Sequence, residues 1–169
     1  MKFGNFAGSS RFQVMHHNGR LQVIPSVFVA AIKDGDVLLL RRHNTGWIDG
    51  SFDLPAGHLE DQEKLRDGAI HELKEETGLV ANPKDLFLIH VYQNHHNPKL
   101  PHYGYIFATK KWQGEPKITE PHKCNEMGFF PLAKLPKETA PYIKAALKDL
   151  NSTRVSDSYW PPGSISQGM

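Results

Sequence analysis

The segment Gly57–Leu79 constrains the fold more than any other part of this chain, because it combines a helical repeat of apolar residues with a cluster of acids. At about 100° per residue, Leu65, Ala69 and Leu73 fall on one stripe of a helical wheel. Gly78 follows at the position where a left-handed residue commonly ends a helix. The pattern therefore predicts a helix that begins at Leu65, ends just before Gly78 and packs on a core.

Three glutamates crowd this predicted helix: Glu72, Glu75 and Glu76. Like charges three or four positions apart destabilise a helix by roughly 0.2–0.5 kcal/mol per pair, so the cluster needs compensation from a bound cation or from an Arg or Lys partner. On the wheel, Glu72 and Glu76 border the apolar stripe, whereas His71 lies on the solvated face. A merely acidic surface helix fits this phase poorly, so the pattern favours a site for a divalent metal.

The same segment resembles the Nudix box, whose pattern is Gly, five residues, Glu, seven residues, Arg-Glu-apolar, one residue, Glu-Glu, one residue and Gly-apolar. The residues of this chain that fall in the pattern are Gly57, Glu63, Glu72, Leu73, Glu75, Glu76, Gly78 and Leu79. At ordinary residue frequencies, such a match arises by chance about once in 10⁸ starting points. The departure is His71, which stands where the family carries Arg. An imidazole that titrates near neutrality is not equivalent to a permanently charged guanidinium.

The resemblance implies an α/β fold, the Nudix-type α/β/α sandwich with a mixed β-sheet. It also implies a hydrolase that cleaves a pyrophosphate bond in a nucleoside diphosphate linked to another moiety, with a (deoxy)nucleoside triphosphate as the expected substrate. The implied cofactor is Mg²⁺ or Mn²⁺, since these ions prefer oxygen ligands and neutralise phosphate charge. The expected partner is therefore a small-molecule nucleotide.

By similarity to the family, the expected metal ligands are Glu72, Glu75, Glu76 and the backbone carbonyl of Gly57. Glu72 and Glu76 are the expected catalytic residues, and Glu72 is the leading candidate to position or deprotonate the attacking water. Glu63, at the start of the helix, fits a structural role as a carboxylate favoured by the helix dipole.

Further candidate site residues lie outside the box. A later loop glutamate sometimes serves as the base in this family, and Glu120 or Glu126 could be a second base or metal ligand here, although each also fits an ordinary surface acid. Arg41, Arg42 and Trp47 could bind substrate, by contacting phosphates or stacking on a base. A pair of arginines at a strand end is more often simply solvated, so the two interpretations compete.

Two other classes of function stay open. A catalytically weak Nudix-fold module that binds nucleotides or has a regulatory role would explain His71, although such a module has no evident need for several partly buried glutamates. An isomerase that uses Cys124 is disfavoured, because the cysteine falls in a predicted polar loop without an identifiable base. A zinc site is disfavoured too, since the histidines between positions 90 and 102 lack a compact spacing with cysteines.

Apolar runs predict further elements on both sides of the box. A β-hairpin is expected from 21–32 and 37–40 around an Asp-Gly turn, with the regular first strand starting near Val27 because Pro25 precedes it. The other predicted elements are strands over 86–92, 103–112 and 126–132 and a closing helix over 137–150.

Length and composition favour one globular domain, since the chain has 169 residues of which 39% are apolar. This domain is expected over 1–150, followed by a flexible Ser/Pro/Gly-rich tail over 151–169, in which Tyr159 and Trp160 could dock on the body or a partner. A net charge of +2 argues against binding to a nucleic acid polymer or an anionic membrane. A homodimer stays open. The single cysteine and the lack of a signal-peptide or membrane-spanning pattern favour a cytoplasmic protein.

Overall fold

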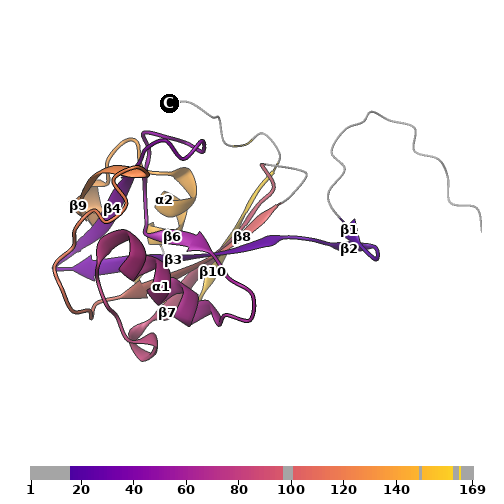
Figure 1. Cartoon of the computed structure of the whole chain (residues 1–169), viewed down its shortest axis with the longest axis horizontal. Helices are drawn as coiled ribbons and strands as arrows, with labels where there is room; N and C mark the ends of the chain where they lie inside the picture. Colours follow the sequence, from indigo (N-terminus) through magenta and orange to yellow (C-terminus); the bar gives the residue numbers. More distant parts are fainter. Residues whose placement is uncertain (1–15, 97–100, 149, 162–163, 165–169) are drawn as a thin grey trace, which may run out of the picture.

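An eight-stranded mixed β-sheet forms the centre of the computed structural model, which describes residues 16–96, 101–148, 150–161 and 164. The neighbours in the sheet are β10, β7, β8, β3, β4 and β5, in that order, while β6 pairs with β3 and β9 pairs with β4 (Figure 1). The strands are β3 (Ile24–Lys33), β4 (Asp36–Arg42), β5 (Phe52–Asp53), β6 (Ala56–His58), β7 (Phe87–Asn94), β8 (His102–Thr109), β9 (Cys124–Pro131) and β10 (Ser156–Trp160).

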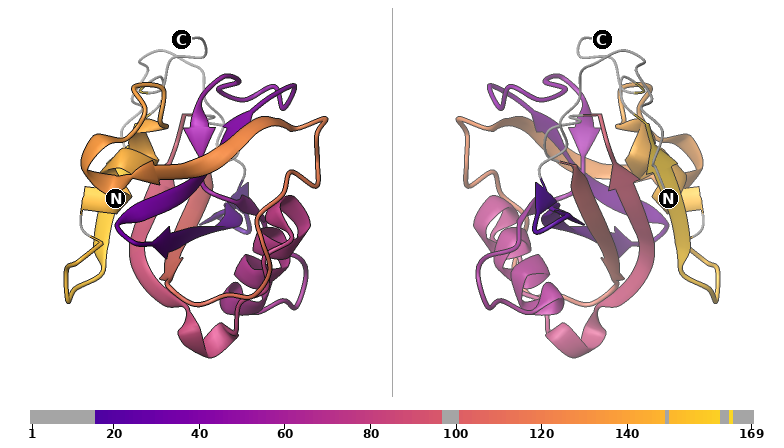
Figure 2. Two further views of the ribbon diagram at one scale, coloured as in Figure 1. Left: turned by 90° about the vertical axis from the view of Figure 1, so that its left-hand side faces the viewer. Right: turned by 90° about the vertical axis from the view of Figure 1, so that its right-hand side faces the viewer.

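Two helices cover opposite faces of this sheet (Figure 2). None of the helices in the described part of the chain is long and apolar enough to cross a membrane. A short antiparallel hairpin precedes β3 and extends away from the body (Figure 1). These remaining elements are β1 (His16–His17), β2 (Arg20–Leu21), α1 (Leu65–Thr77), α2 (Pro141–Lys148) and the 3₁₀ turns η1 (Pro83–Asp85) and η2 (Leu132–Lys134).

Alternate residues of β3 face two separate cores, because successive side chains of a strand point to opposite faces of the sheet. Val27 packs in one core with Leu73 of α1, and Phe28 packs in the other with Ile143 of α2. The β3–β8 and β7–β10 pairs are parallel, whereas the other pairs in the sheet are antiparallel. The predicted α/β/α sandwich with a mixed sheet is therefore confirmed.

The two most local predictions are confirmed. Asp34 and Gly35 both adopt positive φ, 51° and 90°, which a two-residue turn between twisted antiparallel strands requires. Helix α1 ends before Gly78, whose φ is 72° and whose N–H donates to the Lys74 carbonyl. In both places the residue types of a short segment determine the backbone conformation.

The predicted start of the first strand near Val27 is wrong, because β3 begins at Ile24 and Pro25 lies inside it. The carbonyl of Pro25 accepts a bond from the Leu59 N–H (3.0 Å), just beyond the end of β6. Because proline has no N–H, Pro25 removes one backbone hydrogen-bond donor. The loss falls at the end of the β3–β6 pair, where it is tolerated.

The closing helix is shorter than the predicted range 137–150, since α2 covers only Pro141–Lys148. The residues before it pair with β5 instead: Phe52 N–H donates to the Glu138 carbonyl (3.1 Å), and Ala140 N–H donates to the Phe52 carbonyl (2.9 Å). Pro141 can occupy the first helical turn because no intrahelical donor is needed there.

Two strand boundaries also differ from prediction. β8 ends at Thr109, so Trp112 lies beyond it and stacks on Phe129 of β9 (6.1 Å between ring centroids, 17°). β9 begins at Cys124 rather than Glu126, so the cysteine predicted in a polar loop is a buried strand residue. Contacts between distant segments decide both boundaries.

The predicted flexible tail over 151–169 contains an ordered strand, because Ser156–Trp160 forms β10 at the edge of the sheet. His90 of β7 bonds to the Ser156 hydroxyl (2.6 Å) and to the Ser158 hydroxyl (2.8 Å) through its two ring nitrogens. Trp160 packs against the α2-side core, as the docking alternative anticipated. Most of the tail beyond Pro161 lies outside the described residues.

Candidate active site

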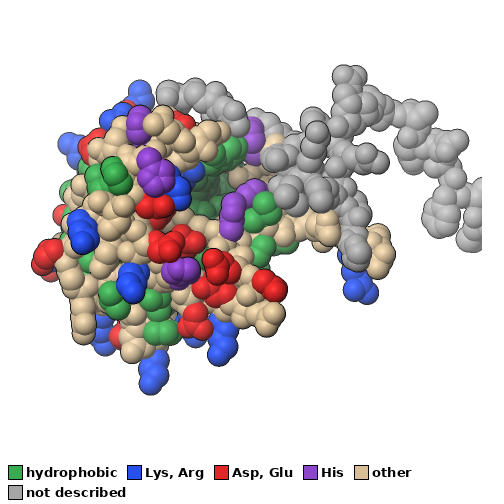
Figure 3. Space-filling view, in the orientation of Figure 1, with side chains coloured by type: hydrophobic (Ala, Val, Ile, Leu, Met, Phe, Trp, Pro, Cys, Tyr) green, Lys and Arg blue, Asp and Glu red, His purple; other side chains and the backbone are tan. Residues whose placement is uncertain are grey.

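A cleft of about 1120 Å³ opens between α1, the β5–β6 turn, the ends of β4, β7 and β8, and the loop before β9. Figure 3 shows acidic side chains gathered beside histidines on this face, next to a hollow with apolar walls. The four predicted metal-ligating residues all line the cleft: Gly57, Glu72, Glu75 and Glu76. The structure thus brings the acidic helix and the loop before it to one site.

Glu72 packs directly on Gly57, because a Cβ at that glycine would overlap the Glu72 carboxyl group. Only glycine therefore allows the β6 backbone to approach the carboxylate this closely. Burial raises the pKa of Glu72, and the neighbouring Glu75 raises it further. The ionised carboxylate is thus destabilised until a cation reaches it.

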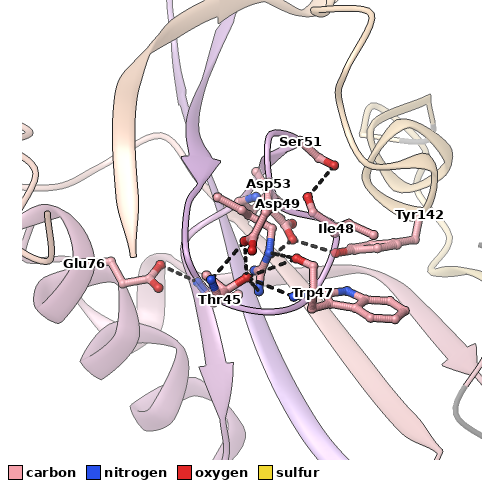
Figure 4. A network of polar contacts seen from close by, with 11 residues as sticks. Thr45, Trp47, Ile48, Asp49, Ser51, Asp53, Glu76 and Tyr142 are labelled. Atoms are coloured by element: carbon pink, nitrogen blue, oxygen red, sulfur yellow. Dashed lines mark hydrogen bonds and ion pairs between the residues drawn. The ribbon is translucent and has the colours of Figure 1, made fainter. Parts of the chain in front are cut away.

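Glu76 is the most buried acid of the helix, and its carboxylate accepts a bond from Ala56 N–H (2.9 Å), drawn in Figure 4. Burial raises the pKa of Glu76 to about 8, although the Ala56 bond opposes that shift. No Lys, Arg or His among the described residues lies within ion-pair distance of Glu72 or Glu76. These two glutamates therefore offer oxygen ligands that no basic side chain of the described residues neutralises.

His71 lies on the solvated face of the helix, as predicted, and is flanked there by two carboxylates. Its Nε2 lies 3.1 Å from Oε1 of Glu75, and its Nδ1 lies 3.5 Å from Oε1 of Glu63. Burial lowers the pKa of His71, but Glu75 and Glu63 together outweigh it and raise the pKa above its usual value. A protonated His71 can thus orient Glu75, the task expected of an arginine at this position.

The two candidate second bases lie in different places. Glu120 lines the cleft, where it pairs with Lys123 (2.8 Å). Glu126 lies on β9 and pairs with Arg41 (3.1 Å), and it does not line the cleft. Glu120 is therefore the better placed of the two.

The three candidate substrate residues all line the cleft, but their donors differ in availability. Arg42 is committed to its own loop, since its Nε donates to the Trp47 carbonyl (2.9 Å) and its Nη2 donates to the Thr45 hydroxyl (3.1 Å). Arg41 donates through Nε to the Gly50 carbonyl (3.1 Å). Trp47 contributes its ring, which lies edge-on to His96 (5.0 Å, 60°). The arginines thus hold the loop over 43–51 in place.

A buried acid that the sequence analysis missed lies inside the cleft. Asp53 accepts bonds from the Tyr142 hydroxyl (2.6 Å) and the Leu54 N–H (2.9 Å), and Arg42 lies 3.5 Å away (Figure 4). Burial raises the pKa of Asp53, although Arg42 and these bonds oppose the shift. The available sequence signal was an aspartate flanked by the apolar Phe52 and Leu54. Its hydrogen-bond partner Tyr142, on α2, is remote in sequence.

Cys124 and the histidines give no support to the alternative chemistries. Burial raises the pKa of the Cys124 thiol, which keeps it protonated and poorly nucleophilic. Among the described residues, no three His, Cys, Asp or Glu side chains are already gathered closely enough to hold a metal ion. The glutamates of α1 would therefore have to converge around any ion they bind.

Comparisons with known proteins agree with this architecture. A family model described as a NUDIX domain matches residues 23–150. The ADP-ribose pyrophosphatase of Methanocaldococcus jannaschii is 36% identical over 121 residues, which cover 70% of this chain and 69% of that protein. Phosphatase NudJ of Shigella boydii is 28% identical over 150 residues, covering 81% and 94%. A MutT NUDIX hydrolase from Burkholderia pseudomallei has a similar structure, with a TM-score of 0.71 at 23% identity over 76% of this chain and 98% of that one. The chain therefore belongs to the Nudix hydrolase family and is a pyrophosphohydrolase.

Proposed function

We propose that this protein uses Mg²⁺ or Mn²⁺ to hydrolyse the pyrophosphate bond of a nucleoside diphosphate linked to another moiety. The observation that carries the proposal is the pair of partly buried carboxylates, Glu72 and Glu76, which line a large cleft and have no cationic partner among the described residues. Such a pair is costly unless a cation neutralises it.

The residues on the α1 side of the cleft offer the ligand atoms that a divalent ion prefers. Glu72, Glu75, Glu76 and the Gly57 carbonyl supply only oxygen donors, which Mg²⁺ and Mn²⁺ prefer. A bound ion would neutralise phosphate oxygens and lower the pKa of water. Glu72 is proposed to position and deprotonate the attacking water, with Glu120 as the alternative base.

The substrate is proposed to be a nucleotide with groups on both sides of the diphosphate. A volume of about 1120 Å³ is slightly above the usual range for small-molecule sites, so the cleft has room for both groups. A (deoxy)nucleoside triphosphate is the substrate class expected from the sequence, and ADP-ribose is the one suggested by the name of the Methanocaldococcus relative.

The test is turnover of a panel of nucleoside triphosphates, ADP-ribose, nucleotide sugars and dinucleotides with Mg²⁺. Glu72→Gln and Glu76→Gln should each lower turnover by about 10²–10⁴-fold with the fold intact. Asp67→Asn is the matched control, because Asp67 is an exposed acid of α1 outside the cleft. Near-normal rates in both glutamine variants would overturn the site, and tight binding without turnover would favour a regulatory module.

A further inference from the structure

We propose that Lys123 binds an oxygen of the substrate diphosphate and that Glu120 holds the lysine in place for this contact. Both residues line the cleft, and Lys123 Nζ lies 2.8 Å from Oε1 of Glu120. This role of Lys123 rests on the proposed function, because the diphosphate has to lie beside the glutamates of α1. Lys123 is thus a catalytic residue, and Glu120 is a positioning residue that acts through it.

A tight turn with a proline brings the two side chains together. The turn covers residues 120–123 and is closed by the Lys123 N–H, which donates to the Glu120 carbonyl (2.9 Å). Pro121 occupies the second position of the turn, where proline is favoured because its φ is already fixed near the required value. Four consecutive residues therefore place an ammonium group and a carboxylate side by side.

The backbone on both sides of this turn is anchored at the site. Before the turn, the Thr119 N–H donates to the Glu76 carbonyl (3.4 Å), and the Thr119 hydroxyl donates to the Glu75 carbonyl. At its end, the Lys123 carbonyl accepts from the His43 N–H (2.7 Å), just beyond β4. The loop between β8 and β9 thus runs along α1 (Figure 2), which fixes the position of Lys123 relative to the glutamates.

Lys123 acts on the acids of α1 without pairing with them. Among the described residues, its ion-pair partner is Glu120, and Glu72 and Glu76 lie beyond that distance. Burial raises the pKa of Glu72, and the charge of Lys123 opposes this shift. The bond to Glu120 raises the pKa of Lys123, and Glu76 and Glu72 raise it further, so the amine stays protonated. A cation that faces acids across a cleft is available to an anion bound there.

Lys123 is also the basic side chain of the cleft that has donors to spare. The described lysine and arginine residues that line the cleft are Arg41, Arg42 and Lys123. Arg42 donates to its own loop, and Arg41 donates to a loop carbonyl and to Glu126. The ammonium group of Lys123 has three donors, of which Glu120 accepts one, and the side chain is 52% exposed. The remaining donors can bind phosphate oxygens.

An ammonium group at this place suits the hydrolysis of a diphosphate. Water attacks one phosphorus atom and gives a proton to the base, proposed to be Glu72. The bond from that phosphorus to the bridging oxygen breaks, and its electron pair moves to that oxygen. Lys123 would stabilise the negative charge that collects on the phosphates as a compact point charge. Because Glu120 already holds the side chain, less rotamer freedom is lost when the phosphate binds.

The first test is kcat/KM of the whole protein with Mg²⁺ and the best substrate of the panel. Lys123→Met removes the charge but keeps a long side chain, so kcat/KM should fall by about 10²-fold, and Lys123→Arg should recover about tenfold of this loss. Lys117→Met is the matched control, because Lys117 is an exposed lysine of the same loop outside the cleft. Lys123→Gln is the second variant if Lys123→Met does not fold.

The second test measures binding without turnover. With Mg²⁺ in excess, methylenediphosphonate, a diphosphate analogue that cannot be hydrolysed at its bridge, should bind Lys123→Met about tenfold more weakly than the wild type in calorimetric titrations. Lys117→Met should bind it as the wild type does. Equal affinity of Lys123→Met and the wild type, or an equal loss in both variants, would overturn the phosphate contact.

A double-mutant cycle tests the positioning role of Glu120. Glu120→Gln removes the ion pair but keeps an acceptor for Lys123, so kcat/KM should fall by about tenfold, less than in Lys123→Met. If Glu120 acts through Lys123, the double variant should be no slower than Lys123→Met alone. Losses that multiply in the double variant would overturn the positioning role and favour Glu120 as a base.

The two tests together separate the role of Lys123 from the proposed reaction. Hydrolysis at the wild-type rate in Lys123→Met would overturn the role of Lys123 alone. Binding of the analogue that depends on Lys123, without turnover of any substrate in the panel, would overturn the proposed reaction alone.

Discussion

The cleft has two walls that differ in how they are built. The α1 wall, formed by α1 and residues 56–63, is acidic and comes from one continuous stretch of chain. The β7 wall, formed by residues 92–96 and the loop 43–51, is aromatic and mostly neutral and comes from separate stretches. The difference indicates that the chemistry of this enzyme is encoded locally, whereas the shape that selects a ligand depends on tertiary packing.

Electrostatics separates the same two walls. On the α1 wall, burial and then neighbouring carboxylates raise the pKa values of Glu72 and Glu76, and a bound cation would oppose this shift. On the β7 wall, His90, a buried residue of β7 that does not line the cleft, is held by two serine hydroxyls of β10. Substitutions on the α1 wall should therefore affect the rate of the reaction. Substitutions that loosen the β7 wall should affect substrate binding.

The largest effect is expected from Gly57→Ala on the α1 wall. The added methyl group would overlap the Glu72 carboxyl group and displace it, so kcat/KM should fall by about 10²-fold while the melting temperature changes little. Gly128→Ala in β9 is the control, because its Cβ would meet only Phe130 at ordinary contact distances. Equal activity of both variants would show that the close packing of Glu72 on Gly57 does not matter.

A smaller effect is expected from His71→Arg, measured as kcat/KM against pH. Glu75 and Glu63 raise the pKa of His71, so its positive charge is present below that pKa and lost as the pH rises through it. Arginine keeps its charge, so the ratio of variant to wild-type activity should rise toward alkaline pH, by up to about fivefold for this exposed pair. A ratio that stays constant across the pH range would remove the proposed role of His71.

The double variant Ser156→Ala, Ser158→Ala tests the β7 wall by removing two hydrogen-bond partners of His90, which belongs to β7. Removing both hydroxyls leaves the buried His90 without these partners and should lower the free energy of unfolding by about 1–3 kcal/mol. KM should rise about threefold with kcat unchanged, because only the substrate-binding wall loosens. Ser152→Ala, outside β10, is the control. A fall in kcat with KM unchanged would contradict the division between the walls.

A last prediction, measured as stability rather than activity, concerns the metal-free protein in EDTA. The folded-state pKa of Glu76, about 8, lies above its usual value of 4.5, so the fold binds an extra proton between these values. Stability should therefore decrease as the pH rises from 5 to 8, and Glu76→Gln should weaken this decrease. Melting temperatures of the two proteins across that range are the measurement, and parallel curves would show that Glu76 is not strained by burial.

The elements that the sequence predicts well are those defined by nearby residues. The α1 helix follows from an apolar repeat and a terminal glycine, and the β3–β4 turn follows from Asp34 and Gly35. The acids of the α1 wall follow from the same repeat, because three of them share one helix. A periodic pattern of this kind is the strongest signal that a single sequence carries.

The elements that the sequence does not predict depend on partners far along the chain. β10 looks like a flexible polar tail until His90 supplies partners for Ser156 and Ser158. Asp53 looks like a turn residue until Tyr142 of α2 donates to it. Tertiary contacts override local propensity at such places, so the β7 wall becomes visible only in three dimensions.

The parallel pairing of β3 with β8 bears on how the enzyme folds. Val27 pairs with Tyr105, and all of α1 and β7 lies in the stretch of chain between them. Closing so long a loop costs conformational entropy before the β3–β8 hydrogen bonds can offset it. A helix, by contrast, forms quickly from local contacts. A chain in the course of folding would thus carry its three glutamates on a helix before it possesses a cleft, and the joining of β3 to β8 would be the step that turns an acidic helix into an enzyme.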